Sequence, residues 1–169
     1  LGLAQGRIGA AELLDLLAIP ALRRGLGLAV EDIDTVEYAL REAAAAWGLD
    51  GAHRAEQGVP AMEERTLGWS LDRLCAGYVF GDEEGEPLLL DGIRPAARLG
   101  DGDAAVLGAL QRLLAELATL RALLPVARSA SRWLSHFRAL LQRLFHPDPQ
   151  DARETAAFEA LQEQFAALQ

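Results

Sequence analysis

The feature that most constrains this chain is an apolar seam that repeats at alternating intervals of four and three residues. Its members are Val106, Leu110, Leu113, Leu117, Leu120 and Leu124. This spacing places all of them on one face of an α-helix and suits close packing against another helix, whereas a half-buried strand would need a period of two. Pro125 ends the helix, which we expect over residues 103–124.

Two further helices are predicted after this seam. The first spans residues 131–145, is capped by Ser129 or Ser131, and has a buried face of Trp133, Phe137, Leu140, Leu141 and Leu144. The short connection from the preceding helix favours an antiparallel helical hairpin. A last helix, capped near Asp151, carries the apolar residues Phe158, Leu161, Phe165 and Leu168.

The first 103 residues predict shorter helices and longer loops. Apolar spacing indicates helices over 10–18, 20–24, 30–47 and 66–81, with a polar connection at 49–65 and a long loop at 82–103. Thr66 can cap the helix at 66–81, whose apolar stripe is Leu67, Leu71, Leu74, Cys75 and Tyr78. One short apolar run at 88–90 does not make a sheet, so the predicted fold class is all-α. We expect residues 1–169 to form a single helical domain, with an acidic part (1–103) and a long-helix hairpin plus terminal helix (104–169).

Charge is distributed unevenly along the chain. The net charge is −9, and all 16 basic residues are arginines. Residues 1–103 hold 9 arginines against 19 acids, and residues 148–169 hold Arg153 against 5 acids. Residues 104–147 hold 6 arginines against Glu116 alone, a net of +5. Because DNA attracts clustered arginines and repels acidic surfaces, this basic segment is the part that favours DNA contact.

A polar stripe on the helix at 131–145 supplies candidate DNA contacts. Arg132, His136 and Arg143 stand at i, i+4 and i+11, opposite the apolar face, and Arg128 extends the stripe. Arginine can bind phosphate oxygens through two parallel hydrogen bonds. Two alternatives remain open: the stripe is a solvated helix face, or its arginines pair with the acidic loops. A protein-docking role, through leucine seams at 106–124 and 158–168, is a second functional hypothesis.

Sequence motifs for catalysis, metals and cofactors are missing, so we expect no catalytic residue, no metal and no cofactor. There is no GxxxxGK[ST] phosphate loop, and the three histidines, His53, His136 and His146, are too dispersed for an HExxH pair. The acids Asp82, Glu83, Glu84 and Glu86 are interpreted as a solvated loop. Asp101-Gly102-Asp103 lacks the later ligands of a calcium loop and is interpreted as a helix cap. The single cysteine, Cys75, is predicted to be an inert thiol on an apolar helix face.

The cellular setting expected from the sequence is the cytoplasm, without membrane insertion. Charged residues interrupt every apolar run well before 18 residues, and residues 1–6 lack the pattern of a signal peptide. A single cysteine fits a reducing compartment. Because the chain lacks an initiating methionine and its apolar seam runs to the last residue, we expect it to be excised from a longer chain.

Two motifs carry a resemblance to a known family. Residues 66–81 read T-L-G-W-S-L-D-R-L-C-A-G-Y-V-F-G. They resemble the run T-W-R-F-G-L-D-R-L-L-L-G-Y-A-M-G of the gamma chains of bacterial exodeoxyribonuclease V, the RecC subunits of RecBCD helicase–nucleases. Identity falls on Thr66, Leu71, Asp72, Arg73, Leu74, Gly77, Tyr78 and Gly81, whereas Leu67 and Trp69 depart from the family pattern. Upstream, W-G-L-D at 47–50 and H-R at 53–54 resemble the family's R-W-G-L-D and H-R.

The resemblance implies a non-catalytic scaffold and DNA-channel domain, similar to the 2B-type accessory subdomain of superfamily 1 helicases. The parent complex would be an ATP-dependent exonuclease and helicase acting in double-strand break repair and homologous recombination. Its partners would be the beta (RecB) and alpha (RecD) subunits and the rest of its own chain, with DNA as a further partner of the segment at 104–147. We expect the motif residues to be structural, with an Asp72–Arg73 ion pair fixing its helix near the upstream motif. These residues are Trp47, Asp50, His53, Arg54, Asp72, Arg73 and Tyr78.

Overall fold

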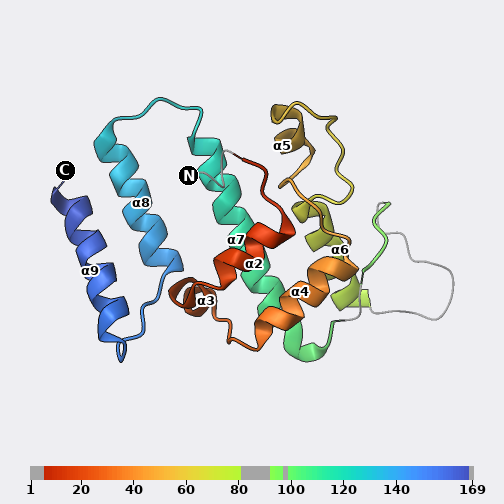
Figure 1. The fold of residues 1–169 in the computed structure, drawn as a ribbon. Helices are drawn as coiled ribbons and strands as arrows, with labels where there is room; N and C mark the ends of the chain where they lie inside the picture. The colour runs from red at the N-terminus through yellow and green to blue at the C-terminus, as the bar shows by residue number, and fades with distance from the viewer. Residues whose placement is uncertain (1–5, 81–91, 97–98, 168–169) are drawn as a thin grey trace.

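A computed structural model describes residues 6–80, 92–96 and 99–167, and the fold of these residues is all-α, as predicted (Figure 1). Its helices are α2 (Ala10–Leu17), α3 (Pro20–Leu26), α4 (Asp32–Glu42), α5 (Gly51–Glu56), α6 (Leu67–Phe80), a 3-10 turn η1 (Asp101–Asp103), α7 (Ala104–Leu123), α8 (Ala130–Leu144) and α9 (Ala152–Ala167). Gly9 and Trp47 form an isolated antiparallel bridge, and no strand is assigned among the described residues. The apolar run at 88–90, the acids at 82–86 and Leu168 lie outside the described residues.

The core forms around α7, whose predicted seam is buried over most of its length. Val106, Leu110, Leu113 and Leu117 are each less than a tenth exposed. They face α6, α4 and α3, so the seam packs mainly against the first half of the chain. Toward the end of the helix the seam is only half-buried. The sequence therefore predicted the seam correctly, but not which helices cover it.

The predicted helix at 30–47 is wrong at its C-terminal end, because α4 stops at Glu42. Ala44 adopts a left-handed conformation with φ 57°, its N–H donates to the Arg41 carbonyl at 2.9 Å, and the next N–H, from Ala45, donates to the Leu40 carbonyl at 2.9 Å. This is the hydrogen-bond pattern of a Schellman C-cap, which normally places glycine at the left-handed position. An alanine there gives no sequence signal for a helix end.

The residues after this cap form an extended segment that the neighbouring chain holds on both sides. Ala46 donates its N–H to the Arg65 carbonyl at 3.0 Å, and its own carbonyl accepts the Ala10 N–H at 3.1 Å. Gly48 donates to the Ile8 carbonyl at 2.7 Å and accepts from Leu67 at 2.8 Å. Long-range backbone pairing therefore outweighs the helical spacing of Trp47. The predicted polar connection at 49–65 is also wrong in part, since it contains the short helix α5.

Helix α6 begins where the sequence indicates, and its buried face matches the predicted stripe at Leu67 and Leu74 only. Thr66 caps it by accepting the Trp69 N–H at 3.2 Å. The inward face carries Leu67, Ser70, Leu74 and Gly77, whereas the predicted stripe residues Leu71, Cys75 and Tyr78 are half-buried. Small residues at two of the four inward positions favour close approach of α4 and α7, the helices against which α6 packs. Ordinary hydrophobic patterning gives no weight to a serine or a glycine.

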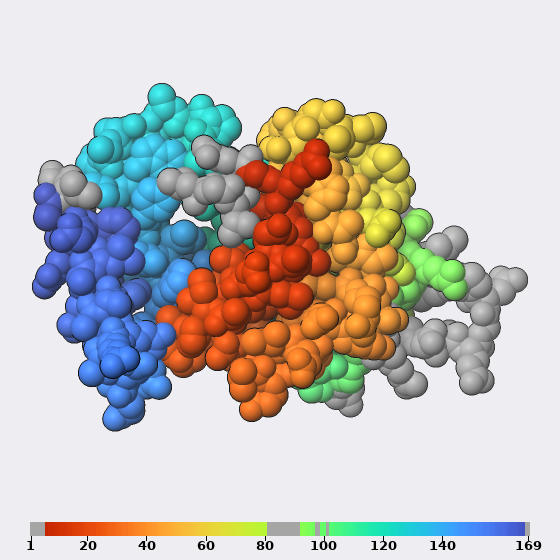
Figure 2. Space-filling model, viewed as in Figure 1, coloured from red at the N-terminus to blue at the C-terminus, as the bar shows by residue number. Residues whose placement is uncertain are grey.

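Helices α7, α8 and α9 run in alternating directions, so the antiparallel hairpin is confirmed (Figure 1). We call residues 130–167, which hold α8 and α9, the α8–α9 limb. Of the predicted buried face of α8, only Leu144 is buried; Trp133, Phe137, Leu140 and Leu141 are half-buried. The prediction overestimated the burial of this face, because α8 contacts the body of the domain mainly at its C-terminal end (Figure 2).

The attachment of the limb is a small contact with α3. A Cβ atom built on Gly25 would lie 1.9 Å from the Leu144 carbonyl oxygen, so the two backbones touch directly. Just beyond α8, the His146 N–H donates to the Ala21 carbonyl at 2.9 Å, and Arg24 donates to the His146 carbonyl at 3.0 Å. Arg24 also pairs with Glu154 of α9. These contacts position the whole limb.

The helices of the described residues are all too short or too polar to cross a membrane.

Candidate functional site

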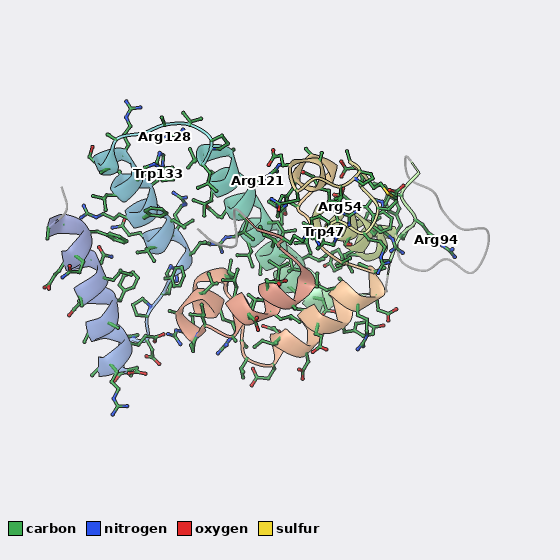
Figure 3. The ribbon with its side chains drawn as sticks, turned by 45° about the horizontal axis from the view of Figure 1, so that its top comes forward. Trp47, Arg54, Arg94, Arg121, Arg128 and Trp133 are labelled. Atoms are coloured by element: carbon green, nitrogen blue, oxygen red, sulfur yellow. The ribbon has the colours of Figure 1, made fainter. Side chains whose placement is uncertain are left out.

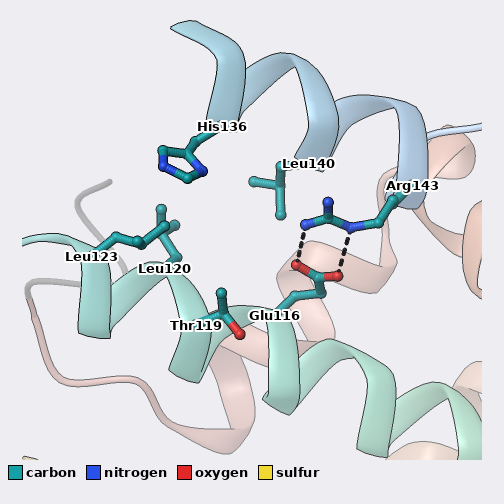
Figure 4. A pocket seen from close by; sticks show the side chains of 7 residues that line it. All are labelled: Glu116, Thr119, Leu120, Leu123, His136, Leu140 and Arg143. Carbon is teal, nitrogen blue, oxygen red and sulfur yellow. Dashed lines mark hydrogen bonds and ion pairs between the residues drawn. The ribbon is translucent and has the colours of Figure 1, made fainter. Parts of the chain in front are cut away.

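The predicted polar stripe of α8 faces α7 across a narrow cleft. His136 and Arg143 point toward α7 on either side of Leu140 (Figure 4). The facing side chains are Glu116, Thr119, Leu120 and Leu123. The cavity between the two helices is about 40 Å³, which is room for a few water molecules and too little for a nucleotide base. The structure thus brings two of the four predicted DNA-contact residues into an internal cleft.

Arg143 is paired with an acid of its own chain. Its Nε and Nη2 atoms donate to the two carboxylate oxygens of Glu116 at 2.9 and 2.8 Å (Figure 4). This hydrogen bonding raises the pKa of the Arg143 guanidinium above its ordinary value. The Arg143 side chain remains about half exposed. Two of its five N–H donors therefore bind Glu116, an acid of the facing helix and not of the acidic loops that the sequence suggested as partners.

Arg128 also has an intramolecular role, whereas Arg132 is exposed. The Arg128 guanidinium donates to the carbonyls of Leu123, the last residue of α7, and of Val126 in the loop that follows, and lies 5.9 Å from the centre of the Trp133 ring. A cation there satisfies carbonyls that the helix leaves unpaired and opposes the negative end of the helix dipole. Among the described residues, the Arg132 side chain has no hydrogen-bond or ion-pair partner.

The basic segment (104–147) also binds the acidic part of the domain (1–103). The contact is made by Arg121, which the sequence analysis did not name as a candidate. Arg121 of α7 lies 2.6 Å from the Glu56 carboxylate and 3.5 Å from that of Asp50 (Figure 3). These partners are separated by more than sixty residues, so no local pattern reveals the pairing. For Arg143, the signal was present, because Glu116 is the only acid in residues 104–147.

The upstream motif forms a buried structural centre around Arg54. Arg54 is 8% exposed, and its guanidinium donates to the backbone carbonyls of Trp47, Met62 and Glu64 at 2.8 to 3.2 Å. It also lies 5.3 Å from the centre of the Trp47 ring (Figure 3). One side chain therefore ties the 58–65 loop to the extended segment.

His53 and Asp50 complete this centre. Asp50 caps α5 by accepting the His53 N–H at 2.6 Å. The His53 ring is 1% exposed; its Nδ1 accepts the Leu49 N–H at 3.1 Å, and its Nε2 lies 3.0 Å from the Gly6 carbonyl. These partners require the neutral tautomer with the proton on Nε2. Both nitrogens are therefore occupied by backbone groups, and the ring is not free to transfer a proton to a substrate.

In the motif at residues 66–81, Arg73 makes contacts other than the expected ones. Arg73 donates to the carbonyls of Ala43 and Arg94, both at 2.8 Å, and lies 4.8 Å from the centre of the Trp69 ring. Burial, and then the charge of Arg94, lower its pKa below the ordinary arginine value. Asp72 is exposed and has no ion pair within the described residues, so the predicted Asp72–Arg73 pair is wrong. Neighbours in sequence on a helix do not face each other, which explains the error. Tyr78 is half-buried against the core.

The remaining candidates for chemistry do not assemble into a reactive site. Cys75 is half-buried, and burial, followed by the nearby Asp72 carboxylate, raises the pKa of its thiol, which disfavours the nucleophilic thiolate. Within the described ranges, no three histidine, cysteine, aspartate or glutamate side chains lie close enough to hold a metal ion. Asp103 accepts the Gly100 N–H at 2.7 Å and so acts as part of a cap at the start of α7.

Comparisons with known proteins point to one family. The profile of the RecBCD enzyme subunit RecC fourth domain matches residues 1–169. The chain is 27% identical over 168 residues to the RecBCD enzyme subunit RecC of Escherichia coli, which covers 99% of this chain and 14% of that protein. It is 28% identical over 134 residues to the subunit of the same name from Mycobacterium tuberculosis, covering 79% of this chain and 12% of that protein. The chain thus spans about one seventh or less of the length of these relatives.

Proposed function

We propose a function for this chain, which belongs to the family of RecC fourth domains. It acts as a non-catalytic scaffold domain of a RecC-type subunit, with residues 1–169 as one domain. The complex is of the exodeoxyribonuclease V type, contains RecB- and RecD-type partners, and works in bacterial double-strand break repair and recombination in the cytoplasm. In this proposal, cleavage and unwinding belong to other parts of the complex.

The observation that carries the scaffold role is the exposure of α9. None of the residues in Ala152–Ala167 is buried, and the helix packs mainly against α8. Its apolar residues Phe158, Leu161 and Phe165 recur at helical spacing and remain half-buried or exposed. An isolated helix of this length is marginal in water, because helices in proteins gain most of their stability from packing an apolar face. The face of α9 is thus suited to cover, or be covered by, another part of the assembly.

The use of the basic residues supports the same role. Arg121 and Arg143 are paired with carboxylates, and Arg128 binds carbonyls at the end of α7. A site that binds DNA through arginines needs their guanidinium donors directed at phosphates. Here, three of the six arginines in residues 104–147 hold the domain together.

The test of the scaffold role is assembly of the complex. A RecC-type subunit carrying this sequence would be expressed with its RecB- and RecD-type partners, as wild type and as Leu161→Asp. Leu161 is 39% exposed, so the change should leave the fold of the domain intact. We expect Leu161→Asp to reduce the amount of three-subunit complex recovered by size exclusion, while Glu159→Gln, on the same helix, leaves it unchanged. Equal recovery of all three complexes would refute the role of α9.

A second candidate function is DNA contact by the limb, which the exposed and unpaired Arg132 favours. Labelled single- and double-stranded DNA would be titrated with the protein at several salt concentrations and followed by fluorescence anisotropy. DNA contact requires binding that weakens steeply with salt and is lost in Arg132→Ala. Binding that Arg132→Ala leaves unchanged would remove the candidate.

A further inference from the structure

The two helices of the α7–α8 hairpin are held together at their ends and separated between them. Among the described helices, α8 packs mainly against α3 and α9, and its contact with α7 is slight. At one end, α8 is fixed where Leu144 touches Gly25 of α3. At the other end, residues 124–129 connect the two helices, and this connection is longer than a tight helical hairpin needs. The hairpin is therefore anchored at the base of α8 and has slack at the opposite end.

The surfaces that face each other across this gap are apolar but not closely packed. Leu120 and Leu123 of α7 and Leu140 of α8 point toward one another, and all three are half-buried (Figure 4). They line the cavity of about 40 Å³ between the helices. Leucines in a packed interface leave no room for water, and burying them is favourable. The cleft is thus a surface that α8 itself can cover by a small movement toward α7.

One ion pair spans the cleft near the base of α8. The Arg143 guanidinium and the Glu116 carboxylate meet end to end between the helices, with hydrogen bonds of 2.9 and 2.8 Å (Figure 4). Both side chains are long, so their pairing holds the two backbones further apart than leucine packing, which brings helix axes to about 8–10 Å. The two side chains are 53% and 22% exposed, so salt reaches and weakens the pair. The ion pair therefore acts as a spacer between the helices.

We propose that the α8–α9 limb is a lid, which the Arg143–Glu116 pair holds open and which closes onto α7 when this pair separates. In the closed state, α8 turns about its contact with α3, Leu140 packs between Leu120 and Leu123, and the cavity disappears. Salt favours closure, because it weakens an exposed ion pair but not the burial of leucines. Because α9 packs mainly against α8, it moves with the lid. This inference goes beyond the proposed function, since it holds whichever partner covers α9.

The test is disulfide capture across the cleft in a RecC-type subunit that carries this sequence. Thr119→Cys and His136→Cys place one cysteine on each wall of the cleft. A disulfide needs Cα atoms within about 4.4–6.8 Å of each other, so its rate of formation under mild oxidation reports how often α8 closes. The crosslinked peptides are identified by mass spectrometry, which separates this disulfide from any that Cys75 forms.

We expect Glu116→Ala and Arg143→Ala each to raise the rate of disulfide formation roughly two- to fivefold, the shift that corresponds to losing one partly exposed ion pair. The two variants change the charge near the thiols in opposite directions, so an increase in both does not come from thiol reactivity. Glu56→Ala serves as the control, because it removes the ion pair of α7 with α5, outside the cleft, and should leave the rate unchanged. Added salt should raise the rate with the ion pair intact and leave it unchanged in Glu116→Ala and Arg143→Ala.

Several outcomes overturn the proposal. If the rate stays the same or falls in both Glu116→Ala and Arg143→Ala, α8 remains in place or moves away from α7. If the rate rises in only one of them, the charge near the thiols explains the change, and if it rises equally in Glu56→Ala, a general loosening of α7 does. The salt series leaves the ion pair intact, so it decides the question even where a variant does not fold: a rate that salt does not raise excludes closure.

Discussion

The contact between α3 and the α8–α9 limb leaves no space for a side chain at residue 25. In Gly25→Ala, the new Cβ would lie 1.9 Å from the Leu144 carbonyl oxygen and 2.5 Å from its carbonyl carbon. Real Cβ atoms do not approach other atoms this closely, and the obstacle is backbone, so no side-chain rotation relieves it. The end of α8 must therefore move away from α3.

The expected cost is at the upper end of that for overpacking a core, about 3 kcal/mol. For a domain of this size, it corresponds to a decrease in Tm of roughly 6–12 °C if the limb unfolds together with the body. If the limb detaches by itself, its amides should exchange with solvent roughly a hundredfold faster, since each 1.4 kcal/mol is a factor of ten. Thermal melting followed by circular dichroism, together with hydrogen exchange read by mass spectrometry, distinguishes the two cases.

The matched control is Gly108→Ala in the second turn of α7. A Cβ there meets nothing within 4 Å, so alanine should stabilise the helix by about 0.5–1 kcal/mol. The reasoning is refuted if Gly25→Ala melts like the wild type and leaves exchange in Ala130–Leu144 unchanged.

Three further predictions concern single contacts. A double-mutant cycle of Arg143→Ala and Glu116→Ala should give a coupling free energy of about 0.5–1 kcal/mol, measured by urea unfolding. Because the ion pair is partly exposed, this coupling should decrease at high salt. Zero coupling at low salt would contradict the pairing. His53→Ala should lower the free energy of unfolding by roughly 2–4 kcal/mol, since it opens a cavity and leaves two buried backbone groups unpaired, and a cost below 1 kcal/mol would refute this. Cys75 should react with iodoacetamide more slowly than a free cysteine at neutral pH, because the pKa of its thiol is raised. Its alkylation rate should increase only as the pH rises above the ordinary thiol pKa. A rate equal to that of free cysteine at neutral pH would contradict this.

Much of the fold could be predicted because long amphipathic helices carry their own signal. The seam of α7, the caps at Thr66 and Asp151, and the antiparallel hairpin of α7 and α8 could all be predicted from spacing, loop length and cap residues. The end of α4 could not be predicted, because an alanine occupies its left-handed cap position. The residues that follow form hydrogen bonds with backbone groups distant in sequence.

The candidate site was less predictable than the fold. The amino-acid types on α8 fit DNA contact, but their partners depend on which helices meet in space. The pairing of Arg143 with Glu116 depends on α8 folding back on α7, and that of Arg121 with Glu56 depends on α5, a helix that the sequence did not reveal. The buried position of Arg54 among carbonyls is likewise set by the 58–65 loop, which has no periodic pattern.

The measurement that tests the scaffold account most directly is hydrogen exchange of α9 in the assembled complex, before and after DNA is added. The account predicts that amides in Ala152–Ala167 exchange more slowly when the RecC-type subunit binds its partners, and that DNA causes no further slowing. Exchange that assembly leaves unchanged, and that slows only when DNA is added, would contradict it and identify the limb as a DNA-contacting surface.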